Sequence, residues 1–87
     1  MSSFVNIGFG NMINADKIVA MITPDSAPAK RMVQKAKEES RLIDATQGRR
    51  TRAVIFMEND RIVLSALLPD TLSARFNNRF DTESAET

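Results

Sequence analysis

Two apolar runs near the middle of the chain constrain its fold more than any other feature. Residues 52–58 and 61–67 are rich in Val, Ile, Leu and Phe, and Asn59 and Asp60 separate them. Runs of strand-forming residues on either side of a turn-forming pair predict a β-hairpin. A sheet therefore lies at the centre of the predicted fold. A two-residue loop would pair Glu58 with Arg61, Phe56 with Val63, and Ile55 with Leu64.

Further strands are predicted on the amino-terminal side of this hairpin. Residues 4–11 read as a short strand that runs into a bend at Gly8-Phe9-Gly10. Residues 17–22 form an almost continuous apolar run whose length suits a strand covered on both faces. Residues 42–46 can form another strand, and Gly48 in the following turn is the natural site for a positive φ.

Two helices complete the predicted elements. The first spans about residues 27–40, with Ser26 as its N-cap and Pro28 in its first turn. The second starts at Pro69 and carries an apolar stripe. The side chains predicted to face inward are Ala29, Met32, Val33, Ala36 and Ser40 on the first helix, and Leu72, Phe76 and Phe80 on the second.

These elements predict an α+β fold, in which one main helix packs on a small, mostly antiparallel sheet and a C-terminal helix follows. Residues 1–80 would form a single domain, and residues 81–87, with three acidic side chains and no apolar periodicity, a disordered tail. The chain has only 87 residues and no cysteine, so disulfides cannot stabilise it. Small domains of this kind often gain buried surface by forming oligomers, so we expect a homo-oligomer.

The residues that are missing exclude much chemistry. Without cysteine or histidine, the chain cannot build a thiolate metal site, a Ser-His-Asp triad or a Cys-His pair. We therefore expect no enzyme activity, no catalytic residues, no metal, no cofactor and no small-molecule substrate. No apolar run is long enough to span a membrane, and the amino terminus lacks the pattern of a secretory signal. These features favour a cytoplasmic protein.

Positive charge is concentrated in residues 26–52, which carry eight basic and three acidic side chains. Three arginines, Arg49, Arg50 and Arg52, follow Gly48 with no acidic residue nearby in the sequence. Guanidinium groups fit phosphate oxygens and the guanine edge in a DNA major groove. The cluster is thus a candidate anion site, although a solvated turn or a subunit interface paired to acids would also account for it.

Weaker signals lie around this cluster. Lys30 and Arg31 belong to a basic helix flank that matters only if folding brings it to the arginines. Lys17 flanks the second strand and could contact a nucleic-acid backbone. Gly8-Phe9-Gly10 lacks both the third glycine of a dinucleotide-binding loop and the Gly-Lys-Ser/Thr ending of a P-loop. We therefore interpret it as a structural bend. Three functions stay open: a DNA-binding oligomer, a module that binds an acidic protein, and a small-anion or nucleotide-binding domain if the bend faces the arginines.

Three blocks of the sequence resemble the bacterial regulator of extracellular matrix A (RemA) family. They are residues 4–11 (FVNIGFGN), 26–31 (SAPAKR) and 42–55 (LIDATQGRRTRAVI), and the resemblance runs from about residue 3 to about residue 76. It implies a cytoplasmic transcriptional regulator that binds double-stranded DNA, without a helix-turn-helix, as a ring-shaped homo-oligomer. In spore-forming bacteria such proteins activate biofilm-matrix genes.

The resemblance also implies site residues. The family's DNA-contacting arginine pair falls on Arg49 and Arg50, and a further functional arginine falls on Lys17, where the charge is kept but the planar fork is lost. The nucleic-acid-binding residues predicted for this chain are Arg49, Arg50, Lys17, Arg52, Lys30 and Arg31.

Overall fold

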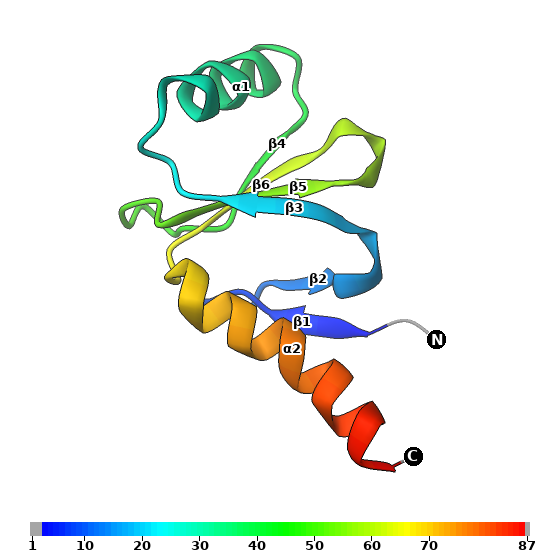
Figure 1. The fold of residues 1–87 in the computed structure, drawn as a ribbon. Helices are drawn as coiled ribbons and strands as arrows, with labels where there is room; N and C mark the ends of the chain where they lie inside the picture. The colour runs from blue at the N-terminus through cyan, green and yellow to red at the C-terminus, as the bar shows by residue number, and fades with distance from the viewer. Residues whose placement is uncertain (1–2, 87) are drawn as a thin grey trace.

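The chain folds into layers around a four-stranded sheet, with α1 over one face and a two-stranded hairpin with α2 over the other (Figure 1). The computed structural model describes residues 3–86, and side chains for residues 3–77. The elements in chain order are β1 (Phe4–Asn6), β2 (Met12–Asn14), a 3-10 turn (Ala15–Lys17), β3 (Ile18–Ile22), α1 (Ala27–Glu38), β4 (Leu42–Asp44), β5 (Ala53–Met57), a 3-10 turn (Glu58–Asp60), β6 (Ile62–Ser65) and α2 (Pro69–Glu86).

The predicted hairpin, β5 and β6, occupies the middle of the larger sheet, whose strand order is β3-β5-β6-β4. β5 runs antiparallel to β3 and β6, whereas β4 runs parallel to β6. Helix α1 connects β3 to β4, so the crossover joins the two edge strands and leaves the hairpin between them. The fold is α+β with a C-terminal helix, as the sequence predicts.

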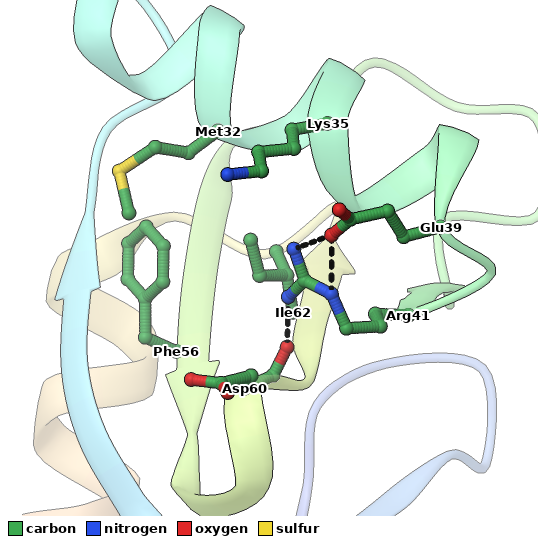
Figure 2. A pocket seen from close by; sticks show the side chains of 7 residues that line it. All are labelled: Met32, Lys35, Glu39, Arg41, Phe56, Asp60 and Ile62. Atoms are coloured by element: carbon green, nitrogen blue, oxygen red, sulfur yellow. Dashed lines mark hydrogen bonds and ion pairs between the residues drawn. The ribbon is translucent and has the colours of Figure 1, made fainter.

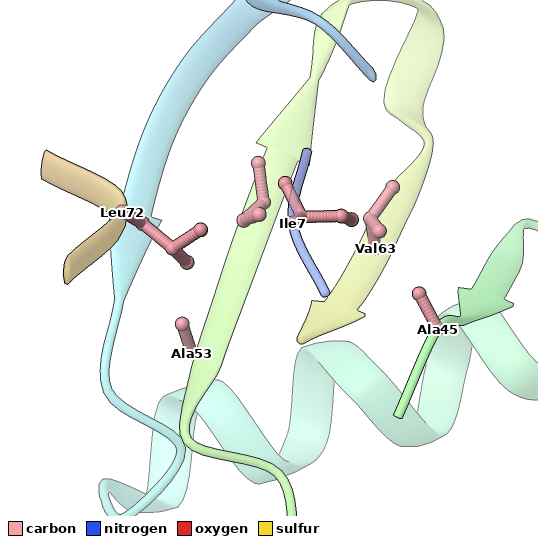
Figure 3. Packing of buried hydrophobic residues seen from close by; sticks show 6 residues of the cluster. Ile7, Ala45, Ala53, Val63 and Leu72 are labelled. Carbon is pink, nitrogen blue, oxygen red and sulfur yellow. The ribbon is translucent and has the colours of Figure 1, made fainter. Parts of the chain in front are cut away.

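The two central strands bury side chains on both faces of the sheet. The face toward α1 buries Val54, Ile62 and Leu64 together with Ala36. The opposite face buries Ala53, Ile55 and Val63 together with Ile7, Ala45 and Leu72, most of which Figure 3 labels. Successive residues of a strand point to opposite faces, so an unbroken apolar run can serve both layers at once. This double coverage explains why β5 and β6 have so few polar side chains.

The predicted register of the hairpin is wrong by one residue. Phe56 pairs with Ile62 and Ile55 with Val63, because Glu58–Asp60 form a three-residue connection rather than a two-residue loop. Asn59 and Asp60 both have positive φ, 70° and 61°, which Asn and Asp tolerate better than most residues. The hydrogen bond from the Met57 N–H to the Arg61 carbonyl closes the loop.

The strand predicted at residues 17–22 is confirmed as β3 (Ile18–Ile22), but the prediction that it is covered on both faces is wrong. β3 starts at Ile18 and lies at an edge of the sheet, and the pairing with β5 shifts between Ile18 and Ala20. Val19 occupies this irregularity and is 68% exposed. Edge strands commonly carry such bulges, which interrupt the ladder of free hydrogen-bonding groups.

Helix α1 begins as predicted and ends earlier than predicted. The Ser26 hydroxyl accepts a hydrogen bond from the Ala29 N–H, as an N-cap does. The last helical residue is Glu38, and Ser40 is exposed with a φ of 59°, so it does not belong to the inward face. The Arg41 N–H donates to the Ala36 carbonyl, a bond that closes such helix ends. Met32, also predicted to face inward, is 47% exposed.

The amino-terminal strand pairs with a partner that the sequence did not predict. β2 forms three antiparallel residue pairs with β1, but its three residues are too few to show a strand pattern. At the other end, Phe76 packs against the core cluster as predicted. The side chains of Phe80 and of the acidic segment 81–87 lie outside the described residues, so the disorder of that segment stays a prediction.

Candidate nucleic-acid interface

The loop between β4 and β5 presents the three clustered arginines. It begins at Asp44, whose Oδ1 accepts hydrogen bonds from the Thr46 N–H at 2.9 Å and the Thr46 hydroxyl at 2.6 Å. The Arg49 N–H then donates to the Thr46 carbonyl at 3.0 Å. Gln47 and Gly48 between them both have positive φ, as in a type I′ turn, so the prediction for Gly48 is confirmed. This tight turn makes the loop project beyond the sheet (Figure 1).

Asp44 is ionised more readily than an ordinary aspartate because of these contacts. The hydrogen bond from the Thr46 hydroxyl is the largest cause that lowers the pKa of Asp44, and the Thr46 N–H is the next. The positive charge of Lys37 adds a smaller effect in the same direction, and burial opposes them. The anchor of the arginine loop is thus a charged carboxylate at neutral pH.

The three arginines lie together at one cleft. Arg49, Arg50 and Arg52 are exposed, and their guanidinium groups form no ion pair or hydrogen bond with any residue that the structure describes. The cleft has a volume of about 400 Å³. We call it the arginine cleft, and its lining consists of Gly8, Phe9, Arg49, Arg50, Arg52, Ala66 and Leu67. Three unneutralised cations around one hollow form a site of positive potential suited to an anion.

Long-range hydrogen bonds bring the Gly8-Phe9-Gly10 bend to the arginines. The buried Ser65 hydroxyl at the end of β6 donates to the Ile7 carbonyl at 2.8 Å and accepts from the Leu67 N–H at 3.1 Å. The Asn11 side-chain amide donates to the Gly8 carbonyl at 3.0 Å and to the Ala45 carbonyl at 3.4 Å, just before the arginine loop. The bend is therefore tied to both segments that border the cleft.

Basic residues on α1 are divided by the fold. Lys30 lines a small hollow together with Thr51, and so lies beside the arginine loop. A neighbouring hollow is lined by Arg50 and Arg52 on one side and by Asp25 on the other, without an ion pair between them. Arg31 is exposed and lines none of these hollows. The structure thus places Lys30 beside the loop that carries the three arginines and leaves Arg31 apart.

Lys17 lies at the opposite end of the sheet from the arginine loop. It precedes Ile18, which pairs with Met57 at the far end of β5, whereas the arginines precede Ala53. Its ammonium group lies 3.6 Å from the Glu58 carboxylate, and both side chains are more than half exposed. Within one chain, Lys17 and the arginines do not form a common site.

A further hollow, between α1 and the β5-β6 connection, contains an arginine that is already neutralised (Figure 2). The guanidinium of Arg41 donates to the Glu39 carboxylate at 2.9 and 2.6 Å, and also to the Asp60 carbonyl. Apolar side chains, including Met32 and Phe56, form much of the remaining wall. This hollow is larger than the other hollows described here, but its chemistry suits a polyanion less well than that of the arginine cleft.

Sequence reasoning named the arginines but not the residues that arrange them. Ser65 and Thr46 are buried polar side chains that hold neighbouring loops, and only the folded chain shows what they contact. Phe9 lay within a motif interpreted as a bend, and its position beside Arg49 depends on contacts far apart in the sequence. Among the described residues, no group of three carboxylates lies close enough together to hold a metal ion.

The comparisons with known proteins agree with the resemblance of the three sequence blocks. The family model for RemA-like proteins, described as extracellular matrix regulatory protein A-like, matches residues 4–76. The chain belongs to the RemA-like family. Residues 4–76 include the bend, helix α1, the arginine loop and the central hairpin, so the whole arginine cleft lies inside the matched region.

Relatives of this RemA-like chain match it over nearly their full length. A protein of Lachnoclostridium phytofermentans is 54% identical over 86 residues, covering 99% of this chain and 94% of the relative. A protein of Carboxydothermus hydrogenoformans is 49% identical, covering 92% of both chains. One of Geobacillus kaustophilus is 52% identical, covering 86% of both. All three bear the provisional name of a regulatory protein, which supports a regulatory role for this RemA-like chain.

The described part of this RemA-like chain contains no helix that is long and apolar enough to cross a bilayer.

Proposed function

We propose that the chain is a transcriptional regulator that binds double-stranded DNA through the arginine cleft and acts as a ring-shaped homo-oligomer. The observation that carries this proposal is the absence of any acidic partner for Arg49, Arg50 and Arg52 among the described residues. Guanidinium groups that the fold leaves unneutralised are available to phosphate oxygens. Membership of the RemA-like family supports a regulatory role.

The extent of the basic surface favours a long anion. Arg50 and Arg52 line both the arginine cleft and the hollow that Asp25 also lines. Lys30 lies beside the latter hollow. A duplex presents phosphates at regular intervals and can contact all of these groups at once. In a ring, several copies of this surface would act on one DNA molecule, so modest binding by each subunit is multiplied by avidity. A regulator that works in this way acts in the cytoplasm.

One observation favours a second candidate function. The Gly8-Phe9-Gly10 bend faces the arginines, which is the condition under which a small-anion or nucleotide site was expected. The cleft could hold a phosphate group against the arginines and an aromatic ring against Phe9. Calorimetry with a mononucleotide tests this function. A third function is binding of an acidic protein, and the dependence of affinity on salt distinguishes it, because binding to many DNA phosphates falls steeply as salt rises.

The first prediction concerns Arg49→Ala and Arg50→Ala. Each variant should fold normally, because exposed substitutions change stability by less than about 0.5 kcal/mol. Each should weaken binding to a fluorescent duplex at least about tenfold, and should make the slope of log affinity against log salt shallower by about 0.9 for every subunit that contacts the duplex. Arg31→Ala is the matched control, since it removes the same charge away from the cleft. Wild-type affinity in both cleft variants would refute the proposed function.

A further inference from the structure

The backbone at Phe9 is unfavourable for the residue that occupies it. Phe9 has a φ of 54° between Gly8 at 113° and Gly10 at 78°, so three successive residues lie at positive φ. Glycine adopts this region freely, whereas a bulky residue there is strained. The Phe9 ring is also 51% exposed, so the fold recovers little hydrophobic stabilisation from it. Residues held in such conformations concentrate at functional sites.

The Phe9 ring contacts the arginine cleft. The Arg49 guanidinium carbon lies 6.0 Å from the centre of the ring, within the range of a cation–π interaction. The ring lines the cleft together with Leu67, so an apolar surface adjoins the three cations. A phosphate bound by Arg49 would bring its attached sugar or a base edge against this surface. The cleft therefore combines an anion-binding part with an apolar part.

The bend holds Phe9 in a defined place. The Gly8 N–H donates to the Asn6 side chain at 2.7 Å, and the Ile7 N–H donates to the Asn11 carbonyl at 2.8 Å. The Asn11 side-chain amide donates back to the Gly8 carbonyl at 3.0 Å. With hydrogen bonds on both sides of it, the backbone at Phe9 does not have to be ordered when a ligand arrives, so less binding energy is lost in placing the ring.

We propose that Phe9 is a nucleic-acid contact residue, whose ring packs against the sugar or base edge next to the phosphate that Arg49 binds. This inference rests on the proposed function and adds a contact that carries no charge. Binding through Phe9 is therefore insensitive to salt, unlike binding through the arginines.

The test compares four variants by fluorescence anisotropy with a duplex over a range of salt concentrations. Phe9→Asn removes the ring and suits the positive φ, and Phe9→Tyr keeps the ring. Phe4→Thr is the matched control, because Phe4 is 62% exposed on β1 at the end of the hairpin away from the bend. Arg49→Ala shows independently whether the cleft binds DNA. Thermal unfolding and sedimentation of each variant report on the fold and on the oligomer.

We expect Phe9→Asn to weaken binding about tenfold, an effect typical of a lost aromatic contact, with an unchanged salt slope. We expect Phe9→Tyr and Phe4→Thr to bind as wild type, and Phe9→Asn to unfold at a temperature no lower than wild type. Three outcomes for Phe9→Asn would overturn the proposal. They are an affinity equal to that of wild type, a salt slope as shallow as that of Arg49→Ala, and a sedimentation coefficient that differs from that of wild type. If Arg49→Ala also binds as wild type, Arg49 does not bind the phosphate, and if Arg50→Ala does so too, the proposed function itself is wrong.

Discussion

At the scale of single residues, the shape of the arginine loop depends on a carboxylate that carries no function of its own. Asp44 accepts two hydrogen bonds from Thr46, and Thr46 in turn accepts one from Arg49. Asp44 forms no ion pair with the arginines at the far end of the loop, among the residues that the structure describes. The geometry of the cations therefore depends on the ionisation of one nearby acid.

The second prediction follows from the lowered pKa of Asp44. The folded chain holds this carboxyl below its ordinary value of 3.8, so its charge stabilises the fold above that pH. The stabilisation is lost as pH falls through the lower folded pKa. The free energies of unfolding of wild type and Asp44→Asn should therefore differ most near pH 7 and converge below about pH 4.

Denaturant unfolding at several pH values measures this difference. Thr46→Val provides a second check, because it removes the hydrogen bond that lowers the pKa of Asp44 most. The pKa of Asp44, measured by carboxyl NMR, should therefore rise in this variant. A difference between wild type and Asp44→Asn that does not vary with pH would contradict the assignment.

At the scale of elements, local patterns predicted what depends on local chemistry. Helix α1 could be predicted because its cap, Ser26, lies next to its first residues, and the central hairpin because both of its strands are apolar throughout. The hairpin register could not, because the choice between a two- and a three-residue loop depends on the backbone that Asn59 and Asp60 adopt. The position of β3 at an edge follows from strand order, which its own residues do not encode.

In the candidate site, too, the sequence predicted local features but not contacts between distant segments. The arginines could be named from the sequence because three neighbouring cations without an acid are visible there. The positions of Lys30 and Phe9 near them could not be predicted, because these segments are far apart in the chain and meet only in the fold, through Ser65, Asn11 and the packing of α1 on the sheet. Ser65 is the connection on which the cleft depends most directly.

The third prediction is that Ser65→Ala destabilises the fold by about 1–3 kcal/mol, because the Ile7 carbonyl and the Leu67 N–H lose a buried partner. It should also weaken DNA binding, since the bend is no longer held against the arginine loop. Chemical denaturation and anisotropy measure the two effects. Ser73→Ala is the control: its hydroxyl makes no hydrogen bond within the described residues, so the change should be neutral. Equal stabilities of Ser65→Ala and wild type would contradict the role given to Ser65.

At the scale of the whole molecule, the surface of one chain is more apolar than an isolated small domain needs. Exposed large side chains include Val19 on β3 and Ile43 on β4. Both β3 and β4 are edge strands of the larger sheet. Large exposed apolar groups beside unpaired strand edges are typical of chains that associate.

The fourth prediction is that the protein is a homo-oligomer at micromolar concentration, since association would cover these side chains. Sedimentation velocity over a series of concentrations measures it. A stable monomer across that range would exclude the ring and would remove the avidity on which the proposed function relies.

The fifth prediction concerns the acidic segment 81–87, which carries a charge of −3 in a chain whose net charge is +1. If several copies assemble, this negative charge is repeated around the assembly and lowers the positive potential that attracts DNA. We expect truncation after Phe80 to raise DNA affinity at low salt, and the gain to shrink as ions screen the charges over about 10 Å at 0.1 M salt. A full-length variant with Asp81→Asn, Glu83→Gln and Glu86→Gln separates charge from length, and it should gain affinity as the truncation does. Equal affinities of all three proteins at low ionic strength would show that the segment does not compete with DNA for the arginines, and would confine the electrostatics of binding to the arginine cleft and its neighbours.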